Sequence, residues 1–86
     1  MAPTRRRTPR LSVDEAFGAV LQELRKERGL SQESLGLASG NGRTFVSQLE
    51  RGERGASLKT LFRLAGALEV APSEIVRGME ARLSPR

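Results

Sequence analysis

The chain has 86 residues, a formal net charge of +5, 37% hydrophobic residues, and no cysteine, histidine or tryptophan. So short a chain predicts one domain with a small core, and a core built mainly from Leu, Val and Ala favours helices over sheets. Because Cys and His are absent, disulfides, the usual zinc sites and thiol or imidazole catalysis are excluded, and no apolar run approaches the roughly 18 residues that cross a membrane.

The first predicted element is a flexible basic arm over residues 1–11. Its first ten residues, MAPTRRRTPR, hold four arginines, two prolines and no acidic residue, so they account for four of the five net positive charges. With almost no apolar side chains, such a segment cannot offset the entropy lost on ordering. Two interpretations stay open for the arm. It is either a solubilising tail or a segment that lies along a DNA duplex and adds salt-dependent affinity through phosphate contacts.

A first helix is predicted from Val13 to Arg28, after an N-cap at Ser12 and before a stop at Gly29. Acidic residues in its first turn and basic residues in its last turn suit the helix dipole. Its apolar residues recur at intervals of three and four, as on one helical face, and are Phe17, Val20, Leu21 and Leu24.

Two short helices are predicted next, separated by the Gly-Asn-Gly turn at residues 40–42. The first is capped by Ser31, turns Leu35 inward and ends at Gly40. All three turn residues tolerate positive φ, so the chain can reverse sharply there, and Gly36 permits close approach of the second helix. Two short helices joined in this way have the geometry of a helix-turn-helix.

The second of these helices runs from about Arg43 to Arg51, with Val46 and Leu49 directed at the core and Gly52 closing it. A fourth helix begins after Ser57. The apolar stripe predicted for it is Leu58, Leu61, Phe62, Ala65 and Leu68. A fifth helix begins at Pro72, a residue suited to the first helical position, and its apolar stripe is Ile75, Val76, Met79 and Leu83.

Three blocks of this sequence, FGAVLQELRKERGLSQESLG, RTFVSQLERG and SLKTLFRLAGALEVAPSEI, have the order and spacing of a known family. From Phe17 to about Val76 the chain resembles the DNA-binding domain of the lambda-repressor and Cro family, also called the XRE family. The resemblance implies an all-α, five-helix, lambda-repressor-like fold. Residues 12–83 would form a helix-turn-helix DNA-binding domain that ends in a dimerisation helix, preceded by the flexible basic arm.

The resemblance also implies base contacts from the third helix, by Arg43, Thr44, Phe45, Ser47 and Gln48. Arg43 can bond bidentately to guanine and Gln48 to adenine. Phe45 stands where the family often has tyrosine and would lie against a sugar or a thymine methyl. From composition alone, the polar members of this set are better explained as a solvated helix face opposite Val46 and Leu49, and it is the resemblance that favours DNA contacts instead.

Phosphate contacts are implied for Gln32, Arg51, Arg54, Ser57 and Lys59. Gln32 matches a family position that touches a phosphate and braces the recognition helix. Arg54 and Lys59 can also be read as ordinary surface charges, and the neighbouring Glu53 would oppose phosphate binding. Arg25 and Glu50 match a buried ion pair between the first and third helices, for which we predict a structural role, since either charge unpaired would be costly.

The sequence departs from the family pattern at three places in the framework, one of which is Ala56, where a proline is common before the fourth helix. Asn41 stands where an apolar residue usually fills the turn, which leaves the packing of the corner open. Ala71 stands where a capping Ser is usual, and we expect the missing cap to cost ~1 kcal/mol.

The apolar residues of the last helix, Ile75, Val76, Met79 and Leu83, have two interpretations. They either close the core or form a seam for a second subunit. We predict the dimer interface, because Met79 and Leu83 lie beyond the family's usual core positions. A symmetric dimer would place two recognition helices in major grooves about 34 Å apart.

We therefore predict a sequence-specific transcriptional regulator that binds a pseudo-palindromic operator in double-stranded DNA as a homodimer through the major groove. It would be cytoplasmic and nucleoid-associated when bound, with no enzymatic activity, cofactor, metal or membrane partner. We expect no attached effector domain, so that protein concentration and operator occupancy would supply control. Restriction-modification controllers, prophage repressors and antitoxins stay open as its class. The alternative is a protein-interaction module, such as an antitoxin or adaptor, with an unknown protein partner.

Overall fold

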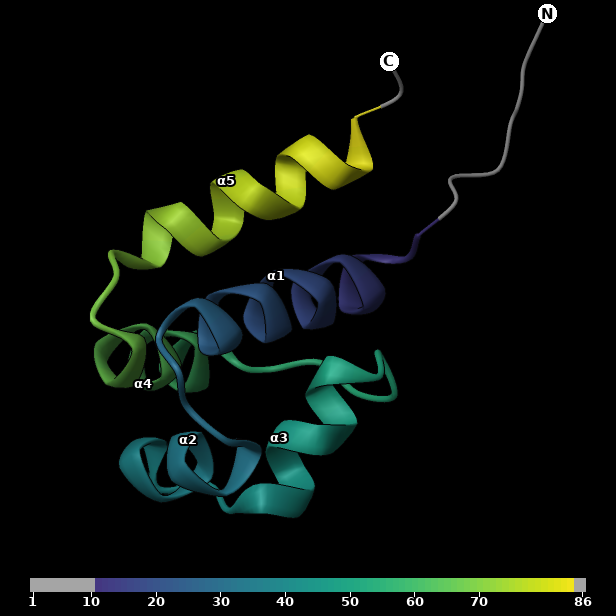
Figure 1. Ribbon diagram of the computed structural model, residues 1–86. Coiled ribbons are helices and arrows are strands. Elements are labelled where there is room, and N and C mark those ends of the chain that lie inside the picture. The colour runs from purple at the N-terminus through teal and green to yellow at the C-terminus, as the bar shows by residue number, and fades with distance from the viewer. Residues whose placement is uncertain (1–10, 85–86) are drawn as a thin grey trace, which may run out of the picture.

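The computed structural model describes residues 11–84, which hold five helices and no strand (Figure 1). The helices are α1 (Val13–Glu27), α2 (Gln32–Ser39), α3 (Arg43–Glu50), α4 (Leu58–Leu68) and α5 (Pro72–Leu83). Each begins at the residue predicted from the sequence. The predicted basic arm lies outside the described residues, apart from Leu11. None of the helices within 11–84 is long and apolar enough to cross a membrane.

All five helices contribute to one hydrophobic core. In Figure 1, α1 lies between α5 on one side and α3 on the other, while α2 contacts both α3 and α4. The buried core residues are Phe17, Val20, Leu21, Leu35, Val46, Leu49, Leu64, Ala65, Leu68 and Ile75. Helices as short as α2 and α3, of eight residues each, are not stable alone in water, so these contacts hold them in place.

The predicted N-caps of α1 and α2 are present. The Ser12 hydroxyl accepts a hydrogen bond from the Glu15 amide at 3.0 Å, and the Glu15 carboxylate accepts one from the Ser12 amide at 2.9 Å. The Ser31 hydroxyl caps α2 by accepting a hydrogen bond from the Ser34 amide. At the start of α5, Ala71 has no hydroxyl to offer, but the Glu74 carboxylate accepts from the Ala71 amide at 3.1 Å. Half of the usual reciprocal cap is therefore kept without the serine.

The apolar stripe predicted for α4 is wrong at two positions. Leu58 and Phe62 are 75% and 61% exposed, whereas Leu64, which the stripe left out, is fully buried. The residues that face inward are Leu61, Leu64, Ala65 and Leu68, which by themselves satisfy the spacing of one helical face. Leu58 lies a turn ahead of this set and Phe62 lies beside it. Both therefore remain on the surface.

One residue of the predicted dimer interface is also misplaced. Ile75 is fully buried in the core of its own subunit, because α5 lies along α1, so its side chain is not available to a second subunit. Val76 is 42% exposed, while Met79 and Leu83 are half-buried. The seam predicted along α5 thus loses its first member, and the other three residues reach the surface to different degrees.

Candidate nucleic-acid interface

The turn between α2 and α3 brings the two backbones into contact. Gly40, with φ +79°, ends α2, and Gly42, with φ +87°, precedes α3, so both use a left-handed conformation that favours glycine. A Cβ on Gly36 would lie 2.4 Å from the carbonyl carbon of Gly42. Because this distance is a steric clash, the position requires glycine. The side-chain nitrogen of Asn41, Nδ2, donates to the carbonyl oxygen of Ser39 at 3.1 Å. The corner is therefore closed by a hydrogen bond where the family usually places an apolar plug.

A second glycine, which no sequence pattern had indicated, lies in α1 and faces the other end of α3. A Cβ on Gly18 in α1 would be 2.2 Å from the carbonyl oxygen of Leu49 and 2.8 Å from that of Glu50. Glycine inside a helical pattern is a weak signal of such close approach, because it otherwise lowers helix stability. The start of α3 is thus held against α2 and its end against α1.

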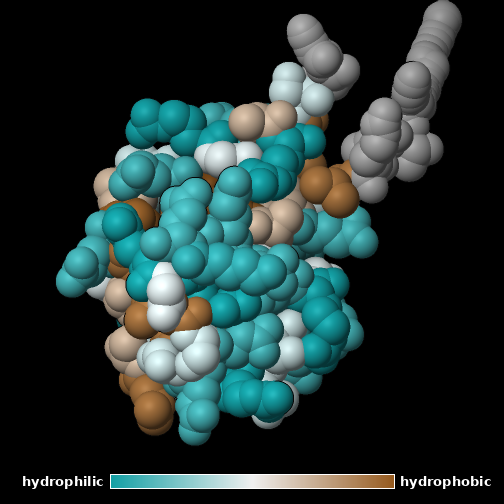
Figure 2. All heavy atoms as spheres, viewed as in Figure 1, coloured by the Kyte–Doolittle hydropathy of each residue, from teal (hydrophilic) through white to brown (hydrophobic). Residues whose placement is uncertain are grey.

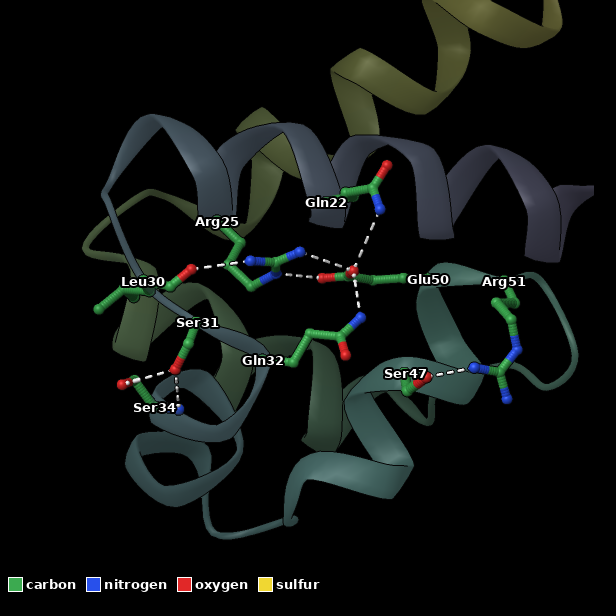
Figure 3. A network of polar contacts seen from close by, with 9 residues as sticks. All are labelled: Gln22, Arg25, Leu30, Ser31, Gln32, Ser34, Ser47, Glu50 and Arg51. Carbon is green, nitrogen blue, oxygen red and sulfur yellow. Dashed lines mark hydrogen bonds and ion pairs between the residues drawn. The ribbon is translucent and has the colours of Figure 1, made fainter.

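The predicted partners Arg25 and Glu50 form an ion pair between α1 and α3 (Figure 3). Arg25 Nε lies 2.6 Å from Glu50 Oε2, and Nη2 donates to Oε1 at 3.0 Å, while Nη1 donates to the carbonyl oxygen of Leu30 at 2.8 Å. The two side chains are 10% and 1% exposed. Hydrogen bonding to Glu50 raises the pKa of Arg25, so the guanidinium stays charged.

Two glutamines complete the contacts of this buried carboxylate. Gln32 Nε2 donates to Glu50 Oε1 at 2.9 Å, and Gln22 Nε2 reaches the same oxygen at 3.4 Å (Figure 3). Gln32 therefore connects the start of α2 to the end of α3. Its Nε2 carries two hydrogens, of which Glu50 uses one, and the contact to a phosphate stays a prediction. Gln22 was not foreseen, although it lies one turn before Arg25 on the same face of α1.

The two faces of α3 differ in the burial of their side chains. Val46 and Leu49 are fully buried, whereas Arg43 and Thr44 are exposed. The remaining predicted base contacts, Phe45, Ser47 and Gln48, are half-buried. Figure 2 shows a largely hydrophilic surface over this side of the molecule, including the region of α3 and the loop after it. The residues predicted to face DNA thus lie at the surface, beneath no other helix of the described chain.

Arg51 bridges α3 and the loop after it. Its guanidinium donates to the Ser47 hydroxyl (Figure 3) and makes two hydrogen bonds to Glu53, at 2.7 and 3.1 Å. These hydrogen bonds hold the pKa of the Glu53 carboxyl below its usual value. Both side chains are exposed, and Arg51 would have to exchange Glu53 for a phosphate to make the contact predicted for it.

Arg54 contacts two residues of the predicted base-contact set. Its guanidinium carbon lies 4.7 Å from the centre of the Phe45 ring, and Nη1 donates to Gln48 Oε1 at 3.1 Å. Phe45 in turn packs against the hydrophobic core. The sequence suggested either a phosphate contact or an ordinary surface charge for Arg54. Its place over α3 depends on the course of the loop, which the local pattern does not specify.

The last two predicted phosphate contacts lie at the start of α4. The Ser57 hydroxyl accepts a hydrogen bond from the Thr60 amide at 3.1 Å and so acts as the N-cap. Lys59 is exposed in the first turn. Phosphate binding by either residue stays a prediction.

The helix-turn-helix family model matches residues 21–75, which run from the middle of α1 to the first turn of α5. The chain belongs to the XRE-type helix-turn-helix family. The fold class predicted from the three sequence blocks is therefore confirmed, and the α2–turn–α3 unit is the helix-turn-helix itself.

Several relatives share this domain. The chain is 42% identical over 66 residues to an uncharacterized HTH-type transcriptional regulator, y4dJ, of Sinorhizobium fredii, covering 77% of this chain and 86% of that protein. The crystal structure of the restriction-modification controller protein C.AhdI from Aeromonas hydrophila matches with a TM-score of 0.70 and 45% identity, covering 72% of this chain and 94% of that one. The controller C.Esp1396I, solved as a tetramer in complex with its natural 35-base-pair operator, matches with a TM-score of 0.76 and 26% identity, covering 85% and 96%.

Proposed function

We propose that this protein is a sequence-specific DNA-binding transcriptional regulator that binds a pseudo-palindromic operator as a homodimer. The main support is the placement of α3, which is clamped at both ends and turns its polar face outward. An α-helix fits the major groove of B-DNA, where each base pair presents a distinct pattern of donors and acceptors. Members of this family are transcriptional regulators, and C.Esp1396I is bound to its operator. Such a protein acts in the cytoplasm, on the nucleoid, and carries out no catalysis.

Arg43 is the residue we expect to contribute most to base recognition. It is exposed in the first turn of α3, and in helix-turn-helix proteins the N-terminal residues of the recognition helix contact base edges. Its guanidinium can donate two hydrogen bonds to one guanine. Thr44, Ser47 and Gln48 follow on the same side, while Gln32, Arg51, Arg54, Ser57 and Lys59 supply phosphate contacts that set the register without reading sequence.

Binding of labelled duplexes tests the function. The DNA upstream of the protein's own gene should be bound tightly at an inverted repeat, and the affinity should fall steeply as salt rises. Equal affinity for unrelated duplexes would argue against a specific regulator. A protein-interaction module would bind no duplex with preference, so the same measurement separates the two candidate functions.

The Arg43→Ala variant should weaken binding to the preferred site by about 1–3 kcal/mol and relax the choice of base at one position of each half-site. Arg77→Ala, which removes an equal charge from the exposed face of α5, is the matched control and should leave the site preference unchanged. Fluorescence anisotropy on the preferred duplex and its single-base variants measures both effects. An Arg43→Ala protein with the original preference would show that another face of the domain reads the DNA.

The dimer interface that we propose includes α4 as well as α5. Exposed apolar side chains, Val13, Leu58 and Val76, line a groove of about 200 Å³ together with Met79. Phe62 lies one helical turn after Leu58 and is 61% exposed. Clustered exposed apolar residues of this kind mark interaction surfaces. A second copy of the chain is the occupant expected of a regulator that binds an inverted repeat.

The Phe62→Glu variant should be monomeric at concentrations where the unaltered protein is dimeric, because the carboxylate would be buried without a partner in the interface. Leu37→Glu is the control, since Leu37 is 76% exposed on α2, outside the groove. Sedimentation equilibrium gives the dissociation constant of each protein. Unchanged dimerisation of the Phe62→Glu variant would place the interface elsewhere.

Of the three kinds of regulator left open by the sequence, the similarity to C.AhdI supports a controller of a restriction-modification system. The two chains are 45% identical over a match that covers 94% of C.AhdI. Genes for an endonuclease and a methyltransferase should then adjoin this one. The operator bound by the protein should lie upstream of one of them. Phage structural genes or a toxin gene in that place would favour the other kinds.

A further inference from the structure

We propose that Arg54 is a specificity-determining positioning residue, which turns the Gln48 amide so that Gln48 selects a keto base, guanine or thymine, in place of adenine. The inference rests on the proposed function and adds the base class that one side chain reads. It differs from the expectation drawn from the sequence, in which Gln48 pairs bidentately with adenine. The observation behind it is the hydrogen bond of 3.1 Å from Arg54 Nη1 to Gln48 Oε1.

The orientation of the Gln48 amide follows from the chemistry of its partner. A guanidinium carries only hydrogen-bond donors, so the amide must direct its oxygen toward Arg54. The amide nitrogen then lies on the other side of the planar group, with its two N–H donors directed away from the guanidinium. Gln48 is half-buried on the outward side of α3, where it would meet the groove. In this arrangement it offers DNA a donor.

Arg54 is held in place by a contact of its side chain and by the backbone hydrogen bonds of the loop that carries it. Its guanidinium lies over the Phe45 ring, a favourable cation–π arrangement, and Phe45 is itself packed against the core. The loop that carries Arg54 is tied to the last turn of α3, because the Glu53 amide donates to the Gln48 carbonyl oxygen at 3.0 Å and the Gly52 amide donates to that of Leu49 at 3.0 Å. The orienting group is therefore in position before DNA binds.

An amide that presents donors distinguishes the four bases in the major groove. Guanine offers two acceptors, N7 and O6, and thymine offers O4. Adenine also offers N7, but its amino group lies beside N7 and opposes the second donor of Gln48, while cytosine presents only an amino group and leaves the Gln48 nitrogen without an acceptor. The Gln48 oxygen keeps a second lone pair, but the bidentate contact to adenine requires the oxygen and the nitrogen to face the base together. The hydrogen bond to Arg54 instead turns the oxygen toward the loop.

The experiment compares base preferences rather than affinity alone. The unaltered protein first selects its site from a pool of randomised duplexes, and the base pair at which Gln48→Ala loses preference identifies the position read by Gln48. Four duplexes that differ only there are then bound to the unaltered protein, to Arg54→Met and to Lys59→Met. Methionine can still pack on Phe45 but donates no hydrogen bond. Lys59→Met removes the same charge from the exposed start of α4.

The unaltered protein should prefer guanine or thymine over adenine by about tenfold, the order of discrimination of a good base contact. In Arg54→Met the freed amide should turn, and the ratio should move by about tenfold in favour of adenine. Lys59→Met should weaken all four duplexes alike and keep the original ratio. Thermal unfolding should be unchanged in Arg54→Met, since Arg54 is exposed.

Three results would overturn the inference. The first is an unchanged ratio in Arg54→Met, which would make Arg54 a phosphate contact alone. The second is a preference for adenine in the unaltered protein, and the third is a Gln48→Ala variant that keeps every preference. An unaltered protein that selects no sequence from the pool would instead overturn the proposed function. The two failures are therefore distinguishable.

Discussion

Replacing Glu50 with alanine should destabilise the fold by about 3 kcal/mol or more, because it removes one partner of a buried ion pair. The Arg25 guanidinium would keep its charge in a site where its side chain is 10% exposed, with only the Leu30 carbonyl oxygen left as an acceptor. Gln32 would lose the acceptor for its amide as well. The end of α3 would then lose its side-chain hydrogen bonds to both α1 and α2.

Thermal unfolding measures this effect, and each kcal/mol corresponds to about 4–8 °C in a domain of this size. Glu23→Ala is the matched control. Glu23 is paired with Arg82 at 2.7 Å, as closely as Glu50 with Arg25, but its side chain is 54% exposed and that of Arg82 is 32% exposed. Solvent screens such a pair, and its loss should cost less than about 1 kcal/mol. Equal losses in the two variants would contradict a special role for the buried pair.

The double variant Arg25→Met, Glu50→Leu separates the cost of an unpaired buried charge from the cost of lost packing. Removing both charges together leaves no unpaired ion, so the double variant should be more stable than Glu50→Ala. A double-mutant cycle gives the coupling between the two residues. If the double variant is the least stable of the set, the cost lies in the loss of packing and not in the isolated charge.

The Gly36→Ala variant should lose about 3 kcal/mol, at the upper end of what overpacking costs. The added Cβ would lie 2.4 Å from the carbonyl carbon of Gly42, 2.5 Å from its oxygen and 2.8 Å from the amide nitrogen of Arg43. All three are backbone atoms and cannot be moved by a change of rotamer. The start of α3 would have to shift, so specific DNA binding should weaken together with stability.

Gly66→Ala is the same substitution at a position with open space, and we expect it to raise stability and not to lower it. A Cβ on Gly66, in the last turn of α4, would have no atom within 4 Å. Alanine is the better helix former by about 1 kcal/mol, so this variant should be more stable than the unaltered protein. Urea unfolding of the two variants gives both changes. A Gly36→Ala protein as stable as Gly66→Ala would mean that the two helices are not in contact at the turn.

Features that depend on neighbours in the chain were predicted well from the sequence. The helix starts follow from local signals such as Ser12, Ser31 and Pro72, because a capping hydroxyl or a fixed φ acts within one turn. The pairing of Arg25 with Glu50 came from the family resemblance, and physical chemistry agrees with it, since neither charge can be buried alone.

Features set by packing between distant segments were harder to predict. Periodicity places Ile75 and Phe62 on apolar faces, but it does not say how wide the covered part of each helix is, and one is buried while the other is exposed. The close contact at Gly18 depends on where the end of α3 crosses α1. The placement of Arg54 over Phe45 depends on the fold of a glycine-rich loop.

The contacts that fix α3 in the domain come from its inner face and its two ends. They involve different residues from those of α3 that we propose to read bases. Arg43 and Thr44 project from the supported helix without contributing to the core. If these residues read bases as we propose, exchanging them should change the preferred operator with little loss of stability. Gln48 is the exception, because its partner lies on the loop. On the role proposed for Arg54, a change of the base read at Gln48 requires a matching change at Arg54, so we expect the two residues to vary together among related regulators.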